Sequence, residues 1–251
     1  MSPAASPPAA MAAASGTRPA AAPSTLSVRG LVVSIESVQA LRGFSIEVEP
    51  GAMVGLSGRN GAGKTTLLRT IMGHLAPRAG AIEFDGASLV ARPPHARAPL
   101  GIGYMPEDRG LVPELTVEEN ILVPLWALRA AGAPERLAMA YRVLPELVPM
   151  RERRALLLSG GQQKLVALAR ALVAGTRLLL LDEPFEGVAP ALSQRLAEVL
   201  AGLKGGPTAV LIAQSDLNHS RSLIEREVVI ERGANAPTPA AAIAAGPAGA
   251  A

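Results

Sequence analysis

The sequence predicts an α/β domain built on a central sheet, and three observations support this. Strand-like and helix-like segments alternate along the middle of the chain, which is typical of a sheet flanked by helices. The run Leu178–Leu181 consists of four leucines, as expected for a strand that is buried on both faces of a parallel sheet. The chain has 251 residues, 49% of them hydrophobic, which is enough for one large domain or two small ones with a sizeable core.

The first half of the chain supplies four of the expected strands and one helix. Short apolar runs bounded by turn-forming residues predict strands, and longer periodic runs predict helices. The strands are expected at Ser45–Glu49, Met53–Leu56, Ala81–Phe84 and Gly101–Met105, and the helix at Thr65–Leu75.

The second half begins with a helical block. The pattern is helical from Thr116 to about Val148, with an interruption at Gly132–Pro134. Because this block lies between strands, it predicts an inserted α-helical subdomain at about residues 108–160. The remaining elements follow in order: helix Gln162–Ala174, strand Arg177–Leu181, helix Pro190–Leu203, strand Thr208–Ala213, a short helix, and strand Glu227–Glu231.

The two ends of the chain differ from the rest in composition. Residues 1–24 are almost entirely Ala, Pro and Ser, and they lack the basic start and unbroken apolar stretch of a secretory signal. We expect a disordered leader there, and a similar disordered tail at residues 234–251. One domain is therefore expected over residues 25–233.

Charge and cysteine content exclude several classes of protein. The chain has 24 Lys and Arg against 21 Asp and Glu, a net charge of +3 that is too small for a nucleic-acid-binding surface. It has no cysteine, which removes disulfides and thiolate metal sites and fits a reducing compartment. The most apolar stretch, Leu165–Leu181, is interrupted by Arg170, Gly175 and Arg177, so it does not reach the roughly 20 apolar residues of a membrane span. Any role at a membrane must come through a partner.

The first chemical motif matches the pattern G-x-x-x-x-G-K-[ST] and lies between an expected strand and an expected helix, the context that supports it. Its glycines let backbone N–H groups turn inward around phosphate oxygens at a helix N-terminus. Lys64 would reach the β- and γ-phosphates, and the Thr65 hydroxyl would bind Mg²⁺. The alternative is a glycine-rich turn without function. The candidate ATP-binding residues are Gly58, Asn60, Gly61, Ala62, Gly63, Lys64, Thr65 and Thr66.

The second motif is the acidic pair that follows the leucine run. Asp182 stands at the carboxyl end of the expected strand, where α/β proteins bind ligands, and is expected to hold Mg²⁺ through water. Glu183 is expected to polarise the attacking water. The alternative is an ordinary acidic turn, which the nearby phosphate motif disfavours.

The third motif is Leu158-Ser159-Gly160-Gly161-Gln162. It lies directly before a long apolar helix and about 20 residues before Asp182. With it, the chain from about Leu26 to Gly233 resembles the ABC ATPase superfamily, whose signature sequence is LSGGQ. The resemblance implies a P-loop NTPase fold and a dimer in which Ser159, Gly160, Gly161 and Gln162 cover the γ-phosphate of ATP bound by the opposite subunit. The alternative is a flexible turn capped by Ser159.

Further segments resemble the ATP-binding subunits of branched-chain amino-acid uptake transporters. They are Gly101–Glu107 followed by Leu115–Asn120, and Glu186–Pro190. This likeness implies transmembrane permease subunits, a second ATP-binding subunit in a homodimer or heterodimer, and an indirect link to a solute-binding protein. It also implies a peripheral position on the cytoplasmic face of the inner membrane. Trp126 is interpreted as a core residue rather than part of the permease contact.

Three positions depart from the superfamily pattern. Ile35 stands where many members have an aromatic residue against adenine, and Glu107 stands where the usual residue is Gln, although either can reach the water shell of the metal. Ser215, preceded by Gln214, stands where a His usually contacts the γ-phosphate. We interpret His219 as a surface residue. Binding should survive these changes, but we expect slow hydrolysis and reliance on a partner ATPase.

Two rival functions follow from the same motifs. A soluble ABC ATPase of DNA repair or translation is disfavoured because this chain has a single cassette, no cysteine and little positive charge. A non-catalytic regulatory subunit is disfavoured by the intact Glu183, but Ser215 keeps that hypothesis open.

Overall fold

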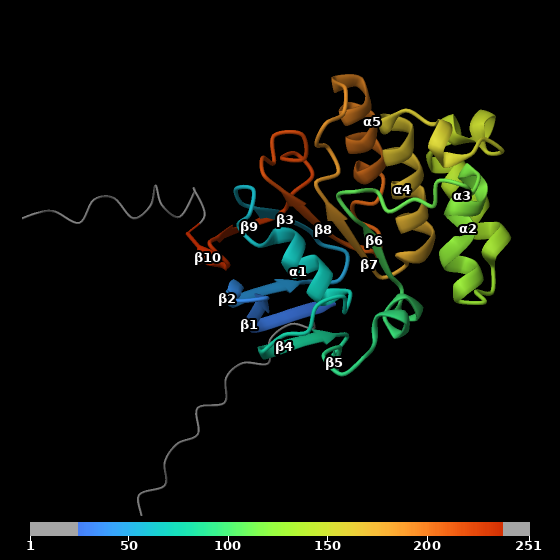
Figure 1. The fold of residues 1–251 in the computed structure, drawn as a ribbon. Helices are drawn as coiled ribbons and strands as arrows, with labels where there is room; N and C mark the ends of the chain where they lie inside the picture. The colour runs from blue at the N-terminus through green and yellow to red at the C-terminus, as the bar shows by residue number, and fades with distance from the viewer. Residues whose placement is uncertain (1–24, 238–251) are drawn as a thin grey trace, which may run out of the picture.

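The fold is α/β, as predicted, and it contains two sheets (Figure 1). The computed structural model describes residues 25–237. The expected leader, residues 1–24, and the tail beyond residue 237 lie outside the described residues.

The larger sheet has six strands and carries the chemical motifs. Its order is β10-β9-β3-β8-β7-β6; the first pair is antiparallel and the other pairs are parallel. The strands are β3 (Met53–Ser57), β6 (Ile102–Met105), β7 (Leu178–Asp182), β8 (Ala209–Gln214), β9 (Arg226–Glu231) and β10 (Ala234–Ala236). Every residue of β7 is buried, as the leucine run predicted.

Strand β10 corrects the expected end of the domain. Residues Ala234–Ala236, assigned from composition to the disordered tail, pair with β9. The Asn235 side chain also holds the backbone of Ser45, accepting from its N–H at 2.8 Å and donating to its carbonyl at 2.7 Å. These hydrogen bonds join parts of the chain 190 residues apart, so composition alone did not reveal them.

The smaller sheet has the order β2-β1-β4-β5 and its pairs are antiparallel. It consists of β1 (Leu26–Ile35), β2 (Val38–Val48), β4 (Ala79–Phe84) and β5 (Ala87–Ser88). Strand β1 was missed from sequence, and Ser45–Glu49 proved to cover only the end of β2. Irregular pairing after Val28 breaks the two-residue alternation of β1, and alternation is the signal by which a half-buried strand is recognised.

The described residues contain five α-helices. They are α1 (Lys64–Ile71), α2 (Val117–Ala127), α3 (Ala133–Val143), α4 (Gly160–Ala174) and α5 (Pro190–Ala201). Helices α2 and α3 lie beyond α4, at the end of the molecule away from the small sheet (Figure 1). They form the helical region expected between strands. The short helix expected after β8 is absent from residues 215–225, which form turns instead.

The leucines of β7 divide the core into two parts. Leu179 and Leu181 belong to the cluster under α4, α5 and the helical region, whereas Leu178 and Leu180 belong to the cluster shared with α1 and the small sheet. The large sheet is thus covered on both faces. It positions the ends of its parallel strands along one edge, where the chemical motifs lie.

Trp126 is 53% exposed, so the expectation that it belongs to the core was wrong. Helix α2 buries Val117, Ile121 and Leu125, which recur every four residues on one face. Trp126 follows Leu125 directly and is therefore turned about 100° away from that face. No helix in residues 25–237 is long and apolar enough to cross a membrane.

Candidate functional site

The phosphate motif forms the turn between β3 and α1. Gly63 has φ +115°, in the left-handed region that favours glycine, and an added Cβ there would lie 3.0 Å from the carbonyl oxygen of Ala40. At Gly58 an added Cβ would lie only 2.4 Å from the carbonyl oxygen of Ile230. Both glycines are therefore required by the close packing of this turn against neighbouring backbone.

Lys64, the first residue of α1, points back into the turn and is 5% exposed. Its Nζ donates to the Gly58 carbonyl at 2.6 Å and lies 3.0 Å from Glu183 Oε1. It also donates to Ser215 Oγ at 3.2 Å. The ammonium group is thus held between the turn and the strand ends that carry the second motif.

Asp182 lies at the end of β7 and has no exposed surface. Its two carboxyl oxygens accept hydrogen bonds from Thr65 Oγ1 at 3.2 Å and from the Tyr104 hydroxyl at 3.4 Å. Burial, which disfavours the charged form, raises the pKa of Asp182 from 3.8 to about 6. Thr65 and Asp182 together offer the oxygen ligands that Mg²⁺ prefers.

Glu183 is held at both carboxyl oxygens. The Ser215 hydroxyl oxygen lies 2.7 Å from Oε1, and the Ser215 backbone N–H donates to Oε2 at 3.2 Å. The same hydroxyl oxygen lies 2.6 Å from Asn60 Oδ1. Glu183 also has φ +46°, which is uncommon for a residue other than glycine.

A cavity of about 300 Å³ lies over these groups. The structure brings together eight of the predicted site residues in its lining, together with Ala40, which no sequence pattern indicated. Gly58 and Ala62 do not line it. The predicted lining residues are Asn60, Gly61, Gly63, Lys64, Thr65, Thr66 and Glu183, joined by the predicted metal-shell residue Glu107.

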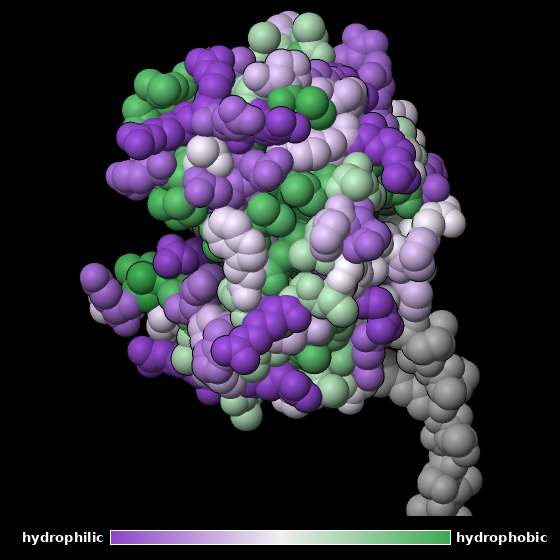
Figure 2. All heavy atoms as spheres, turned by 90° about the vertical axis from the view of Figure 1, so that its right-hand side faces the viewer, coloured by the Kyte–Doolittle hydropathy of each residue, from purple (hydrophilic) through white to green (hydrophobic). Residues whose placement is uncertain are grey.

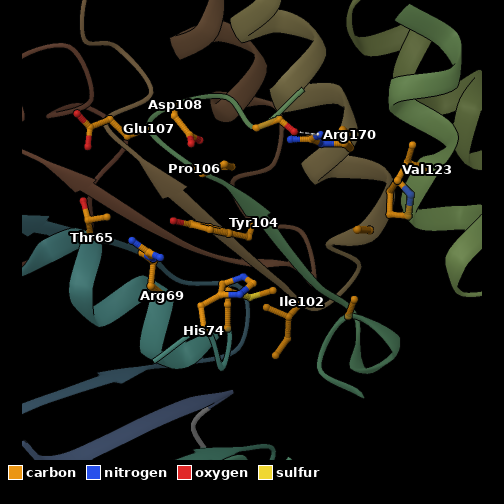
Figure 3. A pocket seen from close by; sticks show the side chains of 15 residues that line it. Thr65, Arg69, His74, Ile102, Tyr104, Pro106, Glu107, Asp108, Val123 and Arg170 are labelled. Atoms are coloured by element: carbon orange, nitrogen blue, oxygen red, sulfur yellow. Dashed lines mark hydrogen bonds between the residues drawn. The ribbon is translucent and has the colours of Figure 1, made fainter. Parts of the chain in front are cut away.

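A larger cleft of about 980 Å³ adjoins the first cavity and shares Thr65 and Glu107 with it. Thr65 and Arg69 from α1 lie on one side of this cleft, Arg170 and Val123 lie on the other, and Tyr104 lies between them (Figure 3). The space-filling view of the side bearing the helical region shows hydrophobic residues gathered between more hydrophilic upper and lower parts (Figure 2).

The third motif lies apart from the cavity. Ser159 is the N-cap of α4: its Oγ accepts from the Gln162 N–H at 3.3 Å, while Gln162 Oε1 accepts from the Ser159 N–H at 3.0 Å. None of the residues Ser159, Gly160, Gly161 and Gln162 lines the cavity over Lys64. The motif therefore forms a capped, surface-exposed helix start in this chain.

Three residues were considered for the position of the histidine that usually contacts the γ-phosphate: Ser215, Gln214 and His219. They lie in different surroundings. Gln214 is 3% exposed and its Oε1 accepts from Ser220 Oγ at 3.0 Å, so its side chain is engaged away from Lys64. His219 is exposed and stacks on Phe185, with ring centroids 5.9 Å apart. Ser215 alone contacts Lys64 and Glu183. Ile35, at the end of β1, is 43% exposed and does not line the cavity.

Comparison with known proteins bears on what this arrangement does. A family model described as ABC transporter matches residues 41–186, a span that includes the phosphate turn, the capped helix start and the acidic pair. The chain belongs to the ABC transporter family. As an ABC ATPase it is an ATP-binding, ATP-hydrolysing subunit of a transporter.

Curated relatives of this ABC ATPase serve different transporters. It is 35% identical over 196 residues to the high-affinity branched-chain amino acid transport ATP-binding protein BraG of Pseudomonas aeruginosa, covering 78% of this chain and 84% of that protein. It is 32% identical over 211 residues to the lipopolysaccharide export system ATP-binding protein LptB of Escherichia coli (strain K12), covering 83% and 88%.

Solved structures agree with the fold. A nucleotide-free ATP-binding cassette from an ABC transporter superimposes with a TM-score of 0.72 at 29% identity, covering 85% of this chain and 90% of that one. An ATP-binding cassette in its ADP conformation gives a TM-score of 0.71 at 30% identity, covering 85% and 89%. The P-loop NTPase architecture predicted from the motifs is thereby confirmed.

Proposed function

We propose that this ABC ATPase powers uptake of branched-chain or related amino acids through separate transmembrane permease subunits. Two features support this substrate class: the likeness to BraG, and the segments Gly101–Glu107 and Leu115–Asn120 that resemble such transporters. The likeness to LptB makes lipopolysaccharide export the competing assignment. A solute-binding protein would deliver the substrate to the permease.

The contact of Lys64 with Glu183 and Ser215 is the observation that carries the proposed chemistry. Lys64 Nζ lies 3.0 Å from the Glu183 carboxylate. When ATP binds, Lys64 is expected to leave this carboxylate and to contact the β- and γ-phosphates. Glu183, once released, would accept a hydrogen bond from the attacking water and orient it toward the γ-phosphate. Ser215 would keep that carboxylate in place through its hydroxyl and its N–H.

The oxygen atoms of Thr65 and Asp182 fit a magnesium ion that arrives with ATP. The Thr65 hydroxyl and Asp182, held 3.2 Å apart, would hold it, and Glu107 would reach its water shell. Bound Mg²⁺ neutralises charge on the β- and γ-phosphates. No group of three or more His, Asp or Glu in residues 25–237 could hold a metal by itself, which suits an ion bound mainly by nucleotide and water.

The exposed start of α4 supports a dimeric assembly. Ser159, Gly160, Gly161 and Gln162 present helix N-terminal amides outside this chain's own cavity. We therefore place them against the γ-phosphate of ATP bound by a facing subunit. Each nucleotide would then lie between one Lys64 turn and one α4 start, and closure would exclude water.

The serine at position 215 supports the hypothesis that this chain forms a heterodimer in which its own site hydrolyses ATP slowly. A serine hydroxyl lacks the protonated form that the usual histidine has, so it stabilises developing phosphate charge less. The rival regulatory function, in which the site only holds ATP, depends on the same residue. A purified homodimer that hydrolyses ATP rapidly would contradict the slow-site hypothesis.

ATPase assays of Glu183→Gln test the catalytic part of the proposal. We expect turnover to fall by at least about 100-fold while ATP binding remains, because only the group that orients water is lost. Glu152→Gln is the matched control, since its carboxylate is 85% exposed and does not line the cavity. Unchanged turnover in Glu183→Gln would favour the regulatory function.

Copurification and reconstitution test the substrate. We expect the chain to copurify with amino-acid permease subunits, and vesicles containing that complex to hydrolyse ATP faster when a binding protein loaded with leucine, isoleucine or valine is supplied. Stimulation by lipopolysaccharide instead would overturn the assignment.

A further inference from the structure

Lys164 is a buried lysine on α4, two residues after Gln162. It is 4% exposed, yet within residues 25–237 it forms no ion pair. Its Nζ donates instead to two backbone carbonyls, that of Glu183 at 2.8 Å and that of Glu186. Burial lowers the pKa of the Lys164 ammonium, as expected for a charge taken out of water.

A buried lysine is energetically unfavourable at a core position. Burying an ammonium group costs several kcal/mol, and an apolar side chain of similar length, such as Met, would fill the same space without that cost. Both neighbours of Lys164 on the buried face of α4, Leu165 and Leu168, are apolar. The charge at this position therefore calls for a reason beyond packing, and its two carbonyl partners indicate one.

The Glu183 carbonyl belongs to the residue with the least favourable backbone in the site. Glu183 has φ +46°, and a residue other than glycine in the left-handed region costs about 1–2 kcal/mol. Its N–H donates to the Ala213 carbonyl at 2.9 Å, and its carbonyl accepts from Lys164. Hydrogen bonds on both sides of its Cα thus fix the direction in which the carboxylate leaves the backbone, toward Lys64 and Ser215.

We propose that Lys164 is a positioning residue for hydrolysis: it holds the Glu183 backbone in its left-handed conformation and so aims the carboxylate over the phosphate turn. The inference rests on the proposed role of Glu183. It adds a link between two nucleotide sites, because α4 begins with the residues proposed to serve the facing subunit's ATP, whereas Glu183 serves the ATP of its own chain.

The neighbouring residue on α4 makes a parallel connection. Gln163 Oε1 accepts a hydrogen bond from Arg109 Nη1 at 2.7 Å, and Arg109 lies two residues after Glu107. The N-terminal part of α4 therefore contacts the two segments that carry Glu107 and Glu183. Gln163 binds the segment of Glu107 through Arg109, and Lys164 binds the backbone of Glu183. A shift of this helix start on closure would move Glu107 and Glu183 together.

The test compares Lys164→Met with Lys164→Arg in the full chain, assembled with its permease and with a companion ATPase whose own water-orienting glutamate is replaced by glutamine. Turnover then comes from the Glu183 site, which is the one proposed to be slow. We expect Lys164→Met to lower kcat by about 10- to 100-fold, because an angstrom-scale misplacement of a reacting group costs that much. Its KM and Kd for ATP should change by less than about twofold, since no phosphate contact is lost. Lys164→Arg, which can still donate to both carbonyls, should recover most of the activity.

Two backgrounds make the result specific. In Glu183→Gln, adding Lys164→Met should cause no further loss of turnover, because the group that Lys164 positions is already gone. Lys204→Met, which removes an exposed lysine, is the control and should behave as wild type. Should Lys164→Met not fold, Lys164→Gln, which keeps one donor for the carbonyls, replaces it under the same criteria.

Two results would overturn the role of Lys164 while leaving the proposed function intact. One is wild-type kcat in Lys164→Met beside an inactive Glu183→Gln. The other is that the Met and Arg variants lose kcat to the same extent and that their melting temperatures fall by the same amount. That result would indicate a role in folding alone. Wild-type turnover in Glu183→Gln would instead refute the proposed function itself.

Discussion

Replacing Asp182 by asparagine should stabilise the nucleotide-free protein. The Asp182 carboxyl is completely buried, and its polar contacts are the two hydroxyl groups of Thr65 and Tyr104. Burial outweighs the favourable influence of the Thr65 hydroxyl and of Lys64, and it raises the pKa of Asp182 to about 6. At pH 8 the folded chain therefore contains an ionised group that would be better solvated in the unfolded chain. An asparagine side chain at this position would have almost the same shape without the charge.

The pKa change sets the size of the effect. Moving the pKa of Asp182 from 3.8 to about 6 corresponds to roughly 3 kcal/mol, at about 1.4 kcal/mol per pH unit. This is an upper limit, because the asparagine amide needs an acceptor that the carboxylate does not. We expect a gain of about 1–3 kcal/mol, which raises the melting temperature of a domain of this size by roughly 2–12 °C.

The pH dependence identifies the cause. Because the pKa is raised on folding, the destabilisation is absent below pH 3.8, grows as the pH rises, and is complete above about pH 6. Thermal melts without Mg²⁺ or nucleotide should therefore show a full advantage for Asp182→Asn at pH 8 and about half of it at pH 5.

The control for this experiment is Asp85→Asn. Asp85 makes a surface ion pair with Arg177 at 2.9 Å, and such pairs contribute little, so the melting temperature should hardly change at either pH. The reasoning would be refuted if Asp182→Asn melted below wild type at pH 8, or if its advantage were the same at both pH values. With Mg²⁺ and ATP the order should reverse, because only wild type keeps the proposed metal ligand.

Two further substitutions test the site, and a third tests the packing at the end of α1. Ser215→Ala should lower kcat by about tenfold in steady-state ATPase assays, since a hydrogen bond to charged Glu183 is worth roughly 1.5–3 kcal/mol and the backbone N–H still holds the other oxygen; unchanged kcat would show that the hydroxyl is idle. Gly63→Ala should abolish ATP binding measured by calorimetry, because the new Cβ would lie 2.9 Å from Leu41 Cδ2 at φ +115°. Arg97→Met should lower the melting temperature by several degrees but leave kcat at 25 °C unchanged. Arg97 donates to the buried carbonyls of Thr70 and Ile71 at the end of α1. The Thr70 carbonyl keeps the Gly73 N–H, but the Ile71 carbonyl would lose its donor at a cost of about 1–3 kcal/mol; a variant as stable as wild type would contradict this.

The parts of this protein that were predicted correctly have local signals. The glycine-rich turn, the leucine run of β7 and the Ser159 start of α4 each combine a motif with its flanking elements in a few residues. Two of the incorrect predictions, on β1 and Trp126, concern segments whose local sequence gives no clear signal. An irregular β1 has no clean alternation, and Trp126 on an apolar helix cannot be assigned to the inner or outer face without knowing what α2 packs against.

Contacts between distant segments could not be read from the sequence. The resemblance to the superfamily indicates the position of Ser215, but not its contact with Asn60, which joins residues 155 positions apart. Nothing in the order of residues shows that Lys164 binds the backbone of Glu183, or that Ala40 lines the cavity. Each of these contacts depends on the sheet order β3-β8-β7, which brings the ends of separate strands to one edge.

The same edge concentrates several unfavourable features. Glu183 has a left-handed backbone and Asp182 has a buried carboxylate. Lys164 has a buried ammonium that forms no ion pair with any residue from 25 to 237. Proteins keep such features where the surrounding structure over-determines them, and they cluster at sites of chemistry. Here the Lys64–Glu183 pair offsets part of the cost in the absence of ATP. Nucleotide and Mg²⁺ would supply charges that suit Lys64 and Asp182 better, so binding is expected to release Glu183 for water while making the site more stable than the free form.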